Sequence, residues 1–159
     1  MKIITLIENT PGVCCCSYQH GLSIYIETEK HRILADTGAD GSFIKNAEML
    51  GIDLALADTL FLSHGHYDHA GGIMDFAALN GHAQIYMQRS AGMEYFSREP
   101  DESMRYIGID SRILNLPNLH LLDSSIDIDD EISILSGITG RRCWSKSNDT
   151  LMLKKETVY

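Results

Sequence analysis

Three histidines and one aspartate fill four of the six positions of the segment 64–69, which reads HGHYDH. Imidazole and carboxylate groups are ligands for Zn²⁺, Fe and Mn, and no thiolate is required. On an extended backbone the side chains alternate, so His64, His66 and Asp68 point to one side. The start of a helix would turn His69 into the same space. The spacing predicts two ligand pairs, His64 with His66 and Asp68 with His69.

The surrounding elements place this segment where sites are commonly built. A continuous apolar run within residues 58–63 predicts a strand buried on both faces, and a helix is expected over 70–80. Loops at the carboxyl ends of strands form the sites of α/β folds. Gly65 would let the backbone pass close to the ligand cluster, and Gly71 and Gly72 would let the helix start pack tightly against the strand. A histidine alone, or an HxH pair, is weak evidence, whereas four ligand-type residues in one loop point to a metal site.

The rest of the chain alternates between strand and helix patterns. A helix around residues 43–50 is indicated by apolar residues at helical spacing, with Asp40 or Ser42 as its N-cap and Gly51 at its end. A short helix is expected at 90–96, and the polar segment 97–118 is interpreted as a surface excursion. Further strands are predicted over residues 2–8, 22–27, 31–36, 84–87, 119–122, 126–128, 132–135 and 150–153.

The segment 62–72 resembles the signature motif of the metallo-β-lactamase superfamily. Four further segments, at 8–10, 20–23, 36–38 and 46–53, are similar to one branch of it. That branch includes the dihydropterin ribofuranosylaminobenzene phosphate synthase of methanopterin biosynthesis and many metallohydrolases. The resemblance extends to about residue 142.

The resemblance implies a fold, a metal centre and a reaction. The implied fold is an α/β (α+β) four-layer αββα sandwich with two metal ions, usually zinc, with Fe or Mn as alternatives. His64 and His66 would bind the first metal and Asp68 and His69 the second. Asp36 matches a supporting residue beside the metals. The implied mechanism is attack by a metal-bound hydroxide on an ester, amide or phosphoester, with Asp68 orienting that hydroxide as a catalytic residue.

The family pattern needs more ligands than this sequence supplies. After His69 only His82 and His120 remain, and both are interpreted as structural or exposed residues, as are His20 and His31 in their loops. A catalytic zinc normally has three protein ligands.

We therefore expect residues 1–159 to be one domain truncated at its C-terminal end, the N-terminal half of the sandwich, with weak or no activity alone. Completion by another chain and loss of the chemistry are the alternatives. An uncovered sheet face would favour a homo-oligomer or pairing with a C-terminal half.

The composition and charge of the chain limit the classes of partner and the cellular location to be expected. The net charge of −9 argues against a nucleic-acid partner. No apolar run is long enough for a membrane span, and the first residues resemble a strand more than a signal peptide, so a cytoplasmic location is expected. The cysteines at positions 14, 15, 16 and 143 are interpreted as reduced thiols. Arg141 and Arg142 form the most concentrated basic patch, so contact with a small anionic substrate is a further hypothesis beside a solvated loop.

Three functions are compatible with these residues and with the resemblance. The first is a metal-dependent hydrolase acting on a small molecule, the second a pterin-pathway synthase, and the third a metal-binding remnant without activity. Metal stoichiometry would separate the third function from the other two. One fold and one metal site serve many reactions, so the substrate depends on residues outside the HGHYDH segment.

Overall fold

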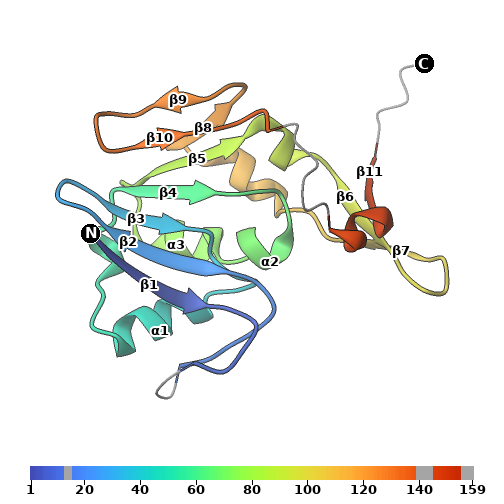
Figure 1. The fold of residues 1–159 in the computed structure, drawn as a ribbon, viewed down its shortest axis with the longest axis horizontal. Helices are drawn as coiled ribbons and strands as arrows, with labels where there is room; N and C mark the ends of the chain where they lie inside the picture. Colours follow the sequence, from blue (N-terminus) through green and yellow to red (C-terminus); the bar gives the residue numbers. More distant parts are fainter. Residues whose placement is uncertain (13–15, 139–144, 155–159) are drawn as a thin grey trace.

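A computed structural model describes residues 1–12, 16–138 and 145–154, and within them one mixed sheet organises the molecule (Figure 1). The sheet has six strands in the order β1-β2-β3-β4-β5-β8. The first three are antiparallel neighbours, and β3, β4, β5 and β8 run parallel. Their bounds are β1 Lys2–Ile7, β2 Ser23–Glu27, β3 Arg32–Ala35, β4 Thr59–Leu62, β5 Gln84–Gln88 and β8 Leu119–Leu122.

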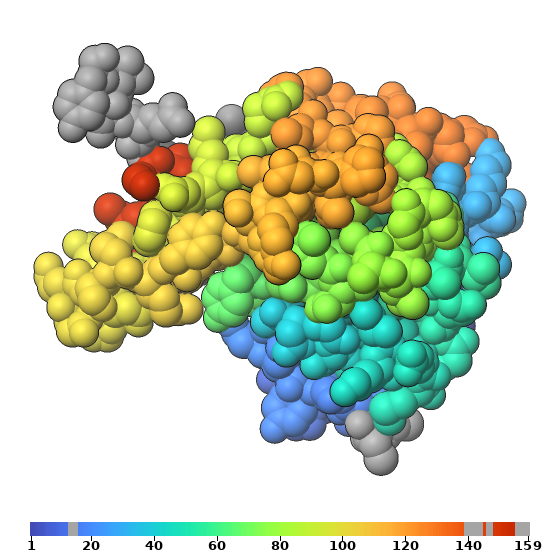
Figure 2. Space-filling model, turned by 180° about the vertical axis from the view of Figure 1, so that it is seen from behind, coloured from blue at the N-terminus to red at the C-terminus, as the bar shows by residue number. Residues whose placement is uncertain are grey.

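Helices cover one face of this sheet. They are α1 (Ser42–Met49), α2 (Tyr67–Ala70), α3 (Ile73–Leu79) and the 3₁₀ turns η1 (Leu54–Leu56), η2 (Arg89–Gly92) and η3 (Ser111–Asn115). A further 3₁₀ turn, η4 (Lys146–Thr150), lies apart from them, directly before strand β11 (Leu151–Leu153) (Figure 1). Phe43 of α1, Phe76 of α3 and Ile113 of η3 are fully buried in one core with the strands. Figure 2 views the molecule from this helical side. No helix among the described residues is long and apolar enough to cross a membrane.

Strand register explains which residues form this core. One row crosses all six strands, consisting of Ile4, Tyr25, Leu34, Leu60, Ile85 and Leu119. Each member is buried in the core or packed against it. Because side chains alternate along a strand, the neighbouring positions face the other way. The sheet is thus covered on the α1–α3 side.

The other face of the sheet carries apolar side chains with partial solvent access. Ile24 and Phe61 lie there half-buried, and Ile3 is 58% exposed. Near it a small hairpin, β9 (Ile126–Asp127) and β10 (Ser133–Ile134), is followed by Leu135, which is 72% exposed. One sheet with helices on one side is half of the predicted αββα sandwich, in agreement with the expected fold class.

Two predictions for residues 90–118 are wrong, because this part of the chain contains a second hairpin. The expected helix at 90–96 is the short turn η2 followed by strand β6 (Tyr95–Arg98), since Gly92 ends the turn and aromatic residues follow. Strand β6 pairs with β7 (Met104–Tyr106) and β11 (Leu151–Leu153). The segment 97–118 is not merely a surface excursion, because Ile107 and Ile109 in it are buried.

Two helix boundaries also differ from the predictions. The expected helix at 70–80 is two helices, α2 and α3, which meet at Gly71 and Gly72. The N-cap of α1 is Gly41 and makes no side-chain cap bond. Asp40 instead accepts a hydrogen bond from the Ser42 N–H at 2.8 Å.

Candidate metal centre

The adjacent parallel strands β3 and β4 bring two chain segments to one end of the sheet. Asp36 follows β3 and Ser63 follows β4. The Asp36 N–H donates to the carbonyl of Phe61 at 3.0 Å, and the Asp36 Oδ1 accepts from the Ser63 N–H at 2.8 Å. Asp36 has a φ of +59°, a conformation that aspartate and asparagine adopt more readily than most residues. Its carboxylate therefore points across to the loop that begins the HGHYDH segment.

A set of backbone contacts fixes α2 beside Asp36. The Thr37 N–H and Oγ1 both donate to the carbonyl of His69, at 2.7 and 2.9 Å. A Cβ at Gly71 would lie 2.1 Å from the Ala39 carbonyl oxygen, so only glycine allows this approach. A Cβ at Gly65 would likewise lie 2.1 Å from a carbonyl oxygen of η2. The sequence predicts a close approach of Gly65 to the ligand cluster, whereas the structure places Gly65 against η2.

The segment gathers its ligand-type side chains. The ring centroid of His64 lies 4.6 Å from that of His66 and 4.2 Å from that of His69. The His69 Nε2 lies 3.5 Å from the Asp68 Oδ2. His66 precedes the helix in an extended conformation, which keeps its ring on the same side as His64. The four residues named from the sequence thus form one cluster.

Hydrogen bonds fix the tautomers of His69 and His64. A carboxylate only accepts, so the His69 Nδ1, at 2.7 Å from the Asp36 Oδ2, carries the proton. The Ser63 hydroxyl donates its single hydrogen to the same oxygen, also at 2.7 Å. At 2.9 Å from this hydroxyl, the His64 Nδ1 must therefore be the donor. In the neutral form of each ring this arrangement leaves Nε2 unprotonated, the state that a metal ligand requires.

The three histidines of the cluster differ in the direction in which their pKa is shifted. Loss of hydration lowers the pKa of His64 to about 4, and the neighbouring His69 and His66 act in the same direction. Loss of hydration also lowers the pKa of His66. The same effect opposes a charge on His69, but its hydrogen bond to Asp36 and the charges of Asp36 and Asp68 outweigh it and raise the pKa. His64 and His66 are consequently neutral at pH 7.

The chemistry of the donor set fits a divalent metal, because it combines three imidazoles with a carboxylate. In the described part of the chain, however, no group of three or more His, Cys, Asp or Glu side chains is arranged for coordination as the side chains stand. Among the described residues, fewer than three such side chains are thus placed to coordinate one ion.

Three residues near the cluster were not anticipated from the sequence. The His20 Nε2 lies 3.3 Å from the Asp68 Oδ2, although His20 was expected to be an ordinary loop residue. The ring of Tyr95 on β6 meets that of His66 edge-on, with centroids 5.6 Å apart. Arg105 on β7 lies over the ring of Tyr67, at 5.8 Å. No sequence signal indicated Tyr95 or Arg105, because the hairpin itself was not predicted.

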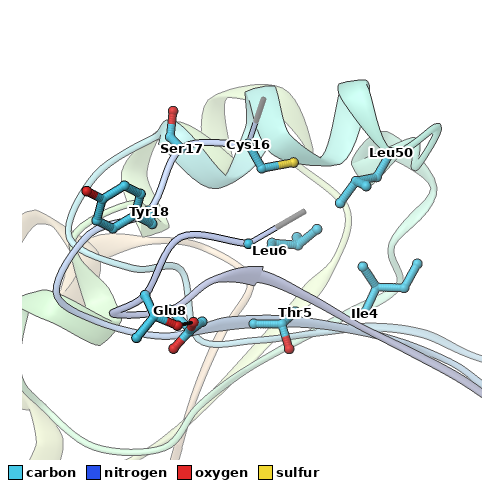
Figure 3. A pocket seen from close by; sticks show the side chains of 10 residues that line it. Ile4, Thr5, Leu6, Glu8, Cys16, Ser17, Tyr18 and Leu50 are labelled. Atoms are coloured by element: carbon cyan, nitrogen blue, oxygen red, sulfur yellow. Dashed lines mark hydrogen bonds between the residues drawn. The ribbon is translucent and has the colours of Figure 1, made fainter. Parts of the chain in front are cut away.

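The remaining candidates lie away from the cluster or outside the described residues. Arg141 and Arg142 lie outside them, as do three of the four cysteines (positions 14, 15 and 143). Cys16 is half-buried beside a cavity of about 440 Å³ between β1, the loop after it and the end of α1 (Figure 3). His82 is exposed, and His120 stacks on Tyr86 with centroids 4.7 Å apart, as expected of structural or surface residues.

Comparison with known proteins identifies the class. The sequence model of the metallo-β-lactamase superfamily matches residues 19–139, which include the whole HGHYDH segment. The chain belongs to the metallo-β-lactamase superfamily.

Two curated proteins and one solved structure are similar to this chain. An uncharacterized protein of Methanocaldococcus jannaschii is 32% identical over 77% of this chain and 48% of its own length. From the same organism, 7,8-dihydropterin-6-methyl-4-(β-D-ribofuranosyl)-aminobenzene-5′-phosphate synthase is 34% identical over 64% of this chain and 37% of its length. The crystal structure of Tm1679, a metal-dependent hydrolase of the β-lactamase superfamily, superposes with a TM-score of 0.72 at 24% identity.

That superposition covers 97% of this chain and 54% of Tm1679. At this identity the likeness establishes the fold. The chain spans about half the length, or less, of the relatives it matches.

Proposed function

We propose that this chain forms the metal-binding part of a hydrolase that acts on a small-molecule ester, amide or phosphoester. His64 and His66 would hold one divalent metal, and Asp68 and His69 a second. Zinc suits these nitrogen and oxygen donors best, with iron or manganese as alternatives. The net charge of −9 favours a small molecule over a nucleic acid as substrate.

One observation carries this proposal, namely the hydrogen-bond relay through Asp36. A buried carboxylate that orients a histidine through Nδ1 is the usual support of a metal-binding imidazole. Asp36 is 2% exposed and receives hydrogen bonds from both Ser63 and His69. Hydrogen bonds hold the Nδ1 side of both His64 and His69, whose ring centroids lie 4.2 Å apart, and this leaves the Nε2 atom of each ring to face a metal.

The chain's own groups would orient the reactants. A bound divalent metal would lower the pKa of a coordinated water and so provide a nucleophile at neutral pH. The Asp68 side chain is 13% exposed and borders a cavity of about 270 Å³, where its carboxylate can accept a proton from an approaching water. His66 and the nearby Tyr95 ring would limit access from the side of the β6–β7 hairpin.

Two other functions have an observation in their favour. The shortage of converging donors within the described residues favours a metal-binding chain without activity of its own. The relative that is 34% identical favours a pterin-pathway synthase. Both share the metal site with the hydrolase, so a test of the site comes before a test of the substrate.

Chromogenic esters and phosphodiesters, assayed with Zn²⁺, Mn²⁺ or Fe²⁺, test the hydrolase proposal. Hydrolysis is expected to depend on the added metal and to fall at least about tenfold in His66→Ala, which removes a metal ligand. His82→Ala is the matched control, because it removes an exposed histidine outside the cluster. Metal binding without any hydrolysis would favour the inactive metal-binding chain, and hydrolysis unchanged by His66→Ala would refute the proposed site.

A further inference from the structure

His20 reaches the metal-binding segment from a different part of the chain. It lies in the loop between β1 and β2, and its Nε2 is 3.3 Å from the Asp68 Oδ2. The His69 Nε2 lies at 3.5 Å from the same oxygen. One carboxylate oxygen is thus close to two imidazole nitrogens that come from separate segments.

The backbone of the loop is built against Asp68, so this approach does not depend on an exposed side chain alone. The Leu22 N–H donates to the Asp68 carbonyl at 3.3 Å, and the Gly21 N–H donates to the Asn9 Oδ1 at 3.0 Å. Gly21 has a φ of +132°, and a Cβ there would lie 2.1 Å from the Asp68 carbonyl oxygen. Only glycine permits this contact, which holds position 20 beside the cluster.

Two of the three distances between the donor atoms are known, and both suit coordination of one ion. Nitrogen and carboxylate oxygen ligands about 2.0–2.2 Å from a tetrahedral zinc lie about 3.3–3.6 Å from one another. Both distances to the Asp68 Oδ2 fall in that interval. As the side chains stand, no three donors converge within the described residues. The His20 side chain is 72% exposed, so its ring is free to turn toward a bound ion.

We propose that His20 is a third protein ligand of the metal held by Asp68 and His69. This inference rests on the proposed metal-dependent function. It gives that metal three protein donors, the number that a catalytic zinc usually has. It also accounts for the glycine at position 21, because the backbone conformation there brings His20 to the Asp68 carboxylate. His20 would otherwise be a surface histidine that forms a solvent-exposed ion pair.

Replacement of the imidazole by a thiol gives a direct spectroscopic test. In the Co²⁺-loaded His20→Cys variant, a cysteine thiolate bound to the metal would produce a near-ultraviolet charge-transfer band, because thiolate is a ligand of such metals. The same change at exposed His82, His82→Cys, is the matched control for the added thiol. A band in His20→Cys that exceeds those of the wild type and His82→Cys supports the proposal, and its absence in metal-loaded His20→Cys overturns it.

Metal affinity provides a second, independent readout. Two binding events are expected in Co²⁺ titrations against a chromophoric chelator. His20→Ala should weaken one of these events at least about tenfold, and His66→Ala should weaken only the other. Equal Co²⁺ affinities in His20→Ala and the wild type would show that His20 is a surface residue and not a metal ligand. The proposed function would then still stand. A wild-type chain that binds no Co²⁺ would instead refute the proposed function itself, and His20 with it.

Discussion

Asp36 connects the fold to the metal-binding segment, and Asp36→Asn isolates its charge. The carboxylate accepts three hydrogen bonds, from the Ser63 N–H at 2.8 Å and from the Ser63 hydroxyl and the His69 Nδ1 at 2.7 Å each. Asparagine keeps the size of the side chain and tolerates the φ of +59°. It also keeps an acceptor for the Ser63 N–H, but presents an NH₂ group where the other two donors need an oxygen.

The expected magnitude follows from these contacts. Each hydrogen bond to a charged acceptor contributes about 1.5–3 kcal/mol, and two of them are lost. The Ser63 hydroxyl can turn and His69 can change its tautomer, so we expect the metal-free protein to lose about 1–3 kcal/mol of unfolding free energy. Metal affinity is expected to fall about 10–100-fold, because His69 would no longer be fixed with a bare Nε2.

Urea unfolding of the metal-free protein and a competition titration with a chelator measure the two effects separately. Asp101→Asn is the matched control, since Asp101 is exposed and accepts hydrogen bonds from nearby Ser103. It is expected to change stability by no more than about 0.5 kcal/mol. If Asp36→Asn bound metal as tightly as the wild type, the hydrogen-bond relay would have no role in the site and its assignment would be refuted.

Three further outcomes are expected. Hydrogen bonds to Asp129 and then Asp58 raise the pKa of His31, so the stability it contributes is present below about pH 6.5 and is lost as the pH rises through the raised value. The difference in unfolding free energy between the wild type and His31→Gln should therefore shrink between about pH 6 and pH 9, and a constant difference would contradict this. Gly65→Ala should cost about 1–3 kcal/mol in thermal unfolding, because its Cβ would meet a carbonyl oxygen of η2, whereas Gly81→Ala faces open space and should be neutral. Size-exclusion chromatography at rising concentration should show association through the uncovered sheet face, and a concentration-independent monomer would contradict that expectation.

Much of the fold could be predicted from the sequence because the strand signals are local. The continuous apolar run before His64 and the alternating pattern from 22 to 27 correspond to strands β4 and β2. The HGHYDH segment predicted a cluster, and the rings of His64, His66 and His69 do lie together. In each case neighbouring residues carry the information, and the period of the pattern selects the element.

The errors arose where distant segments decide the structure. His20 is the exposed loop residue that the sequence predicts, but nothing near it in sequence indicates its contact with Asp68, which depends on the β1–β2 loop folding over α2. Tyr95 was assigned to a helix, yet it forms a strand paired with β7 and β11, and β11 lies about fifty residues further along the chain. Such long-range pairing overrides local propensity, so the neighbours of His66 could not be foreseen.

Every function proposed for this chain requires that the HGHYDH segment bind a divalent metal, and metal content per chain measures this directly. Plasma mass spectrometry would be applied to protein prepared without chelators and without a histidine tag. We expect about one to two equivalents of zinc, iron or manganese per chain. This content should be largely lost on combining His64→Ala with His66→Ala and retained on combining His82→Ala with His120→Ala. A chain without bound metal, or one whose metal survives the loss of His64 and His66, would show that this segment is not a metal site.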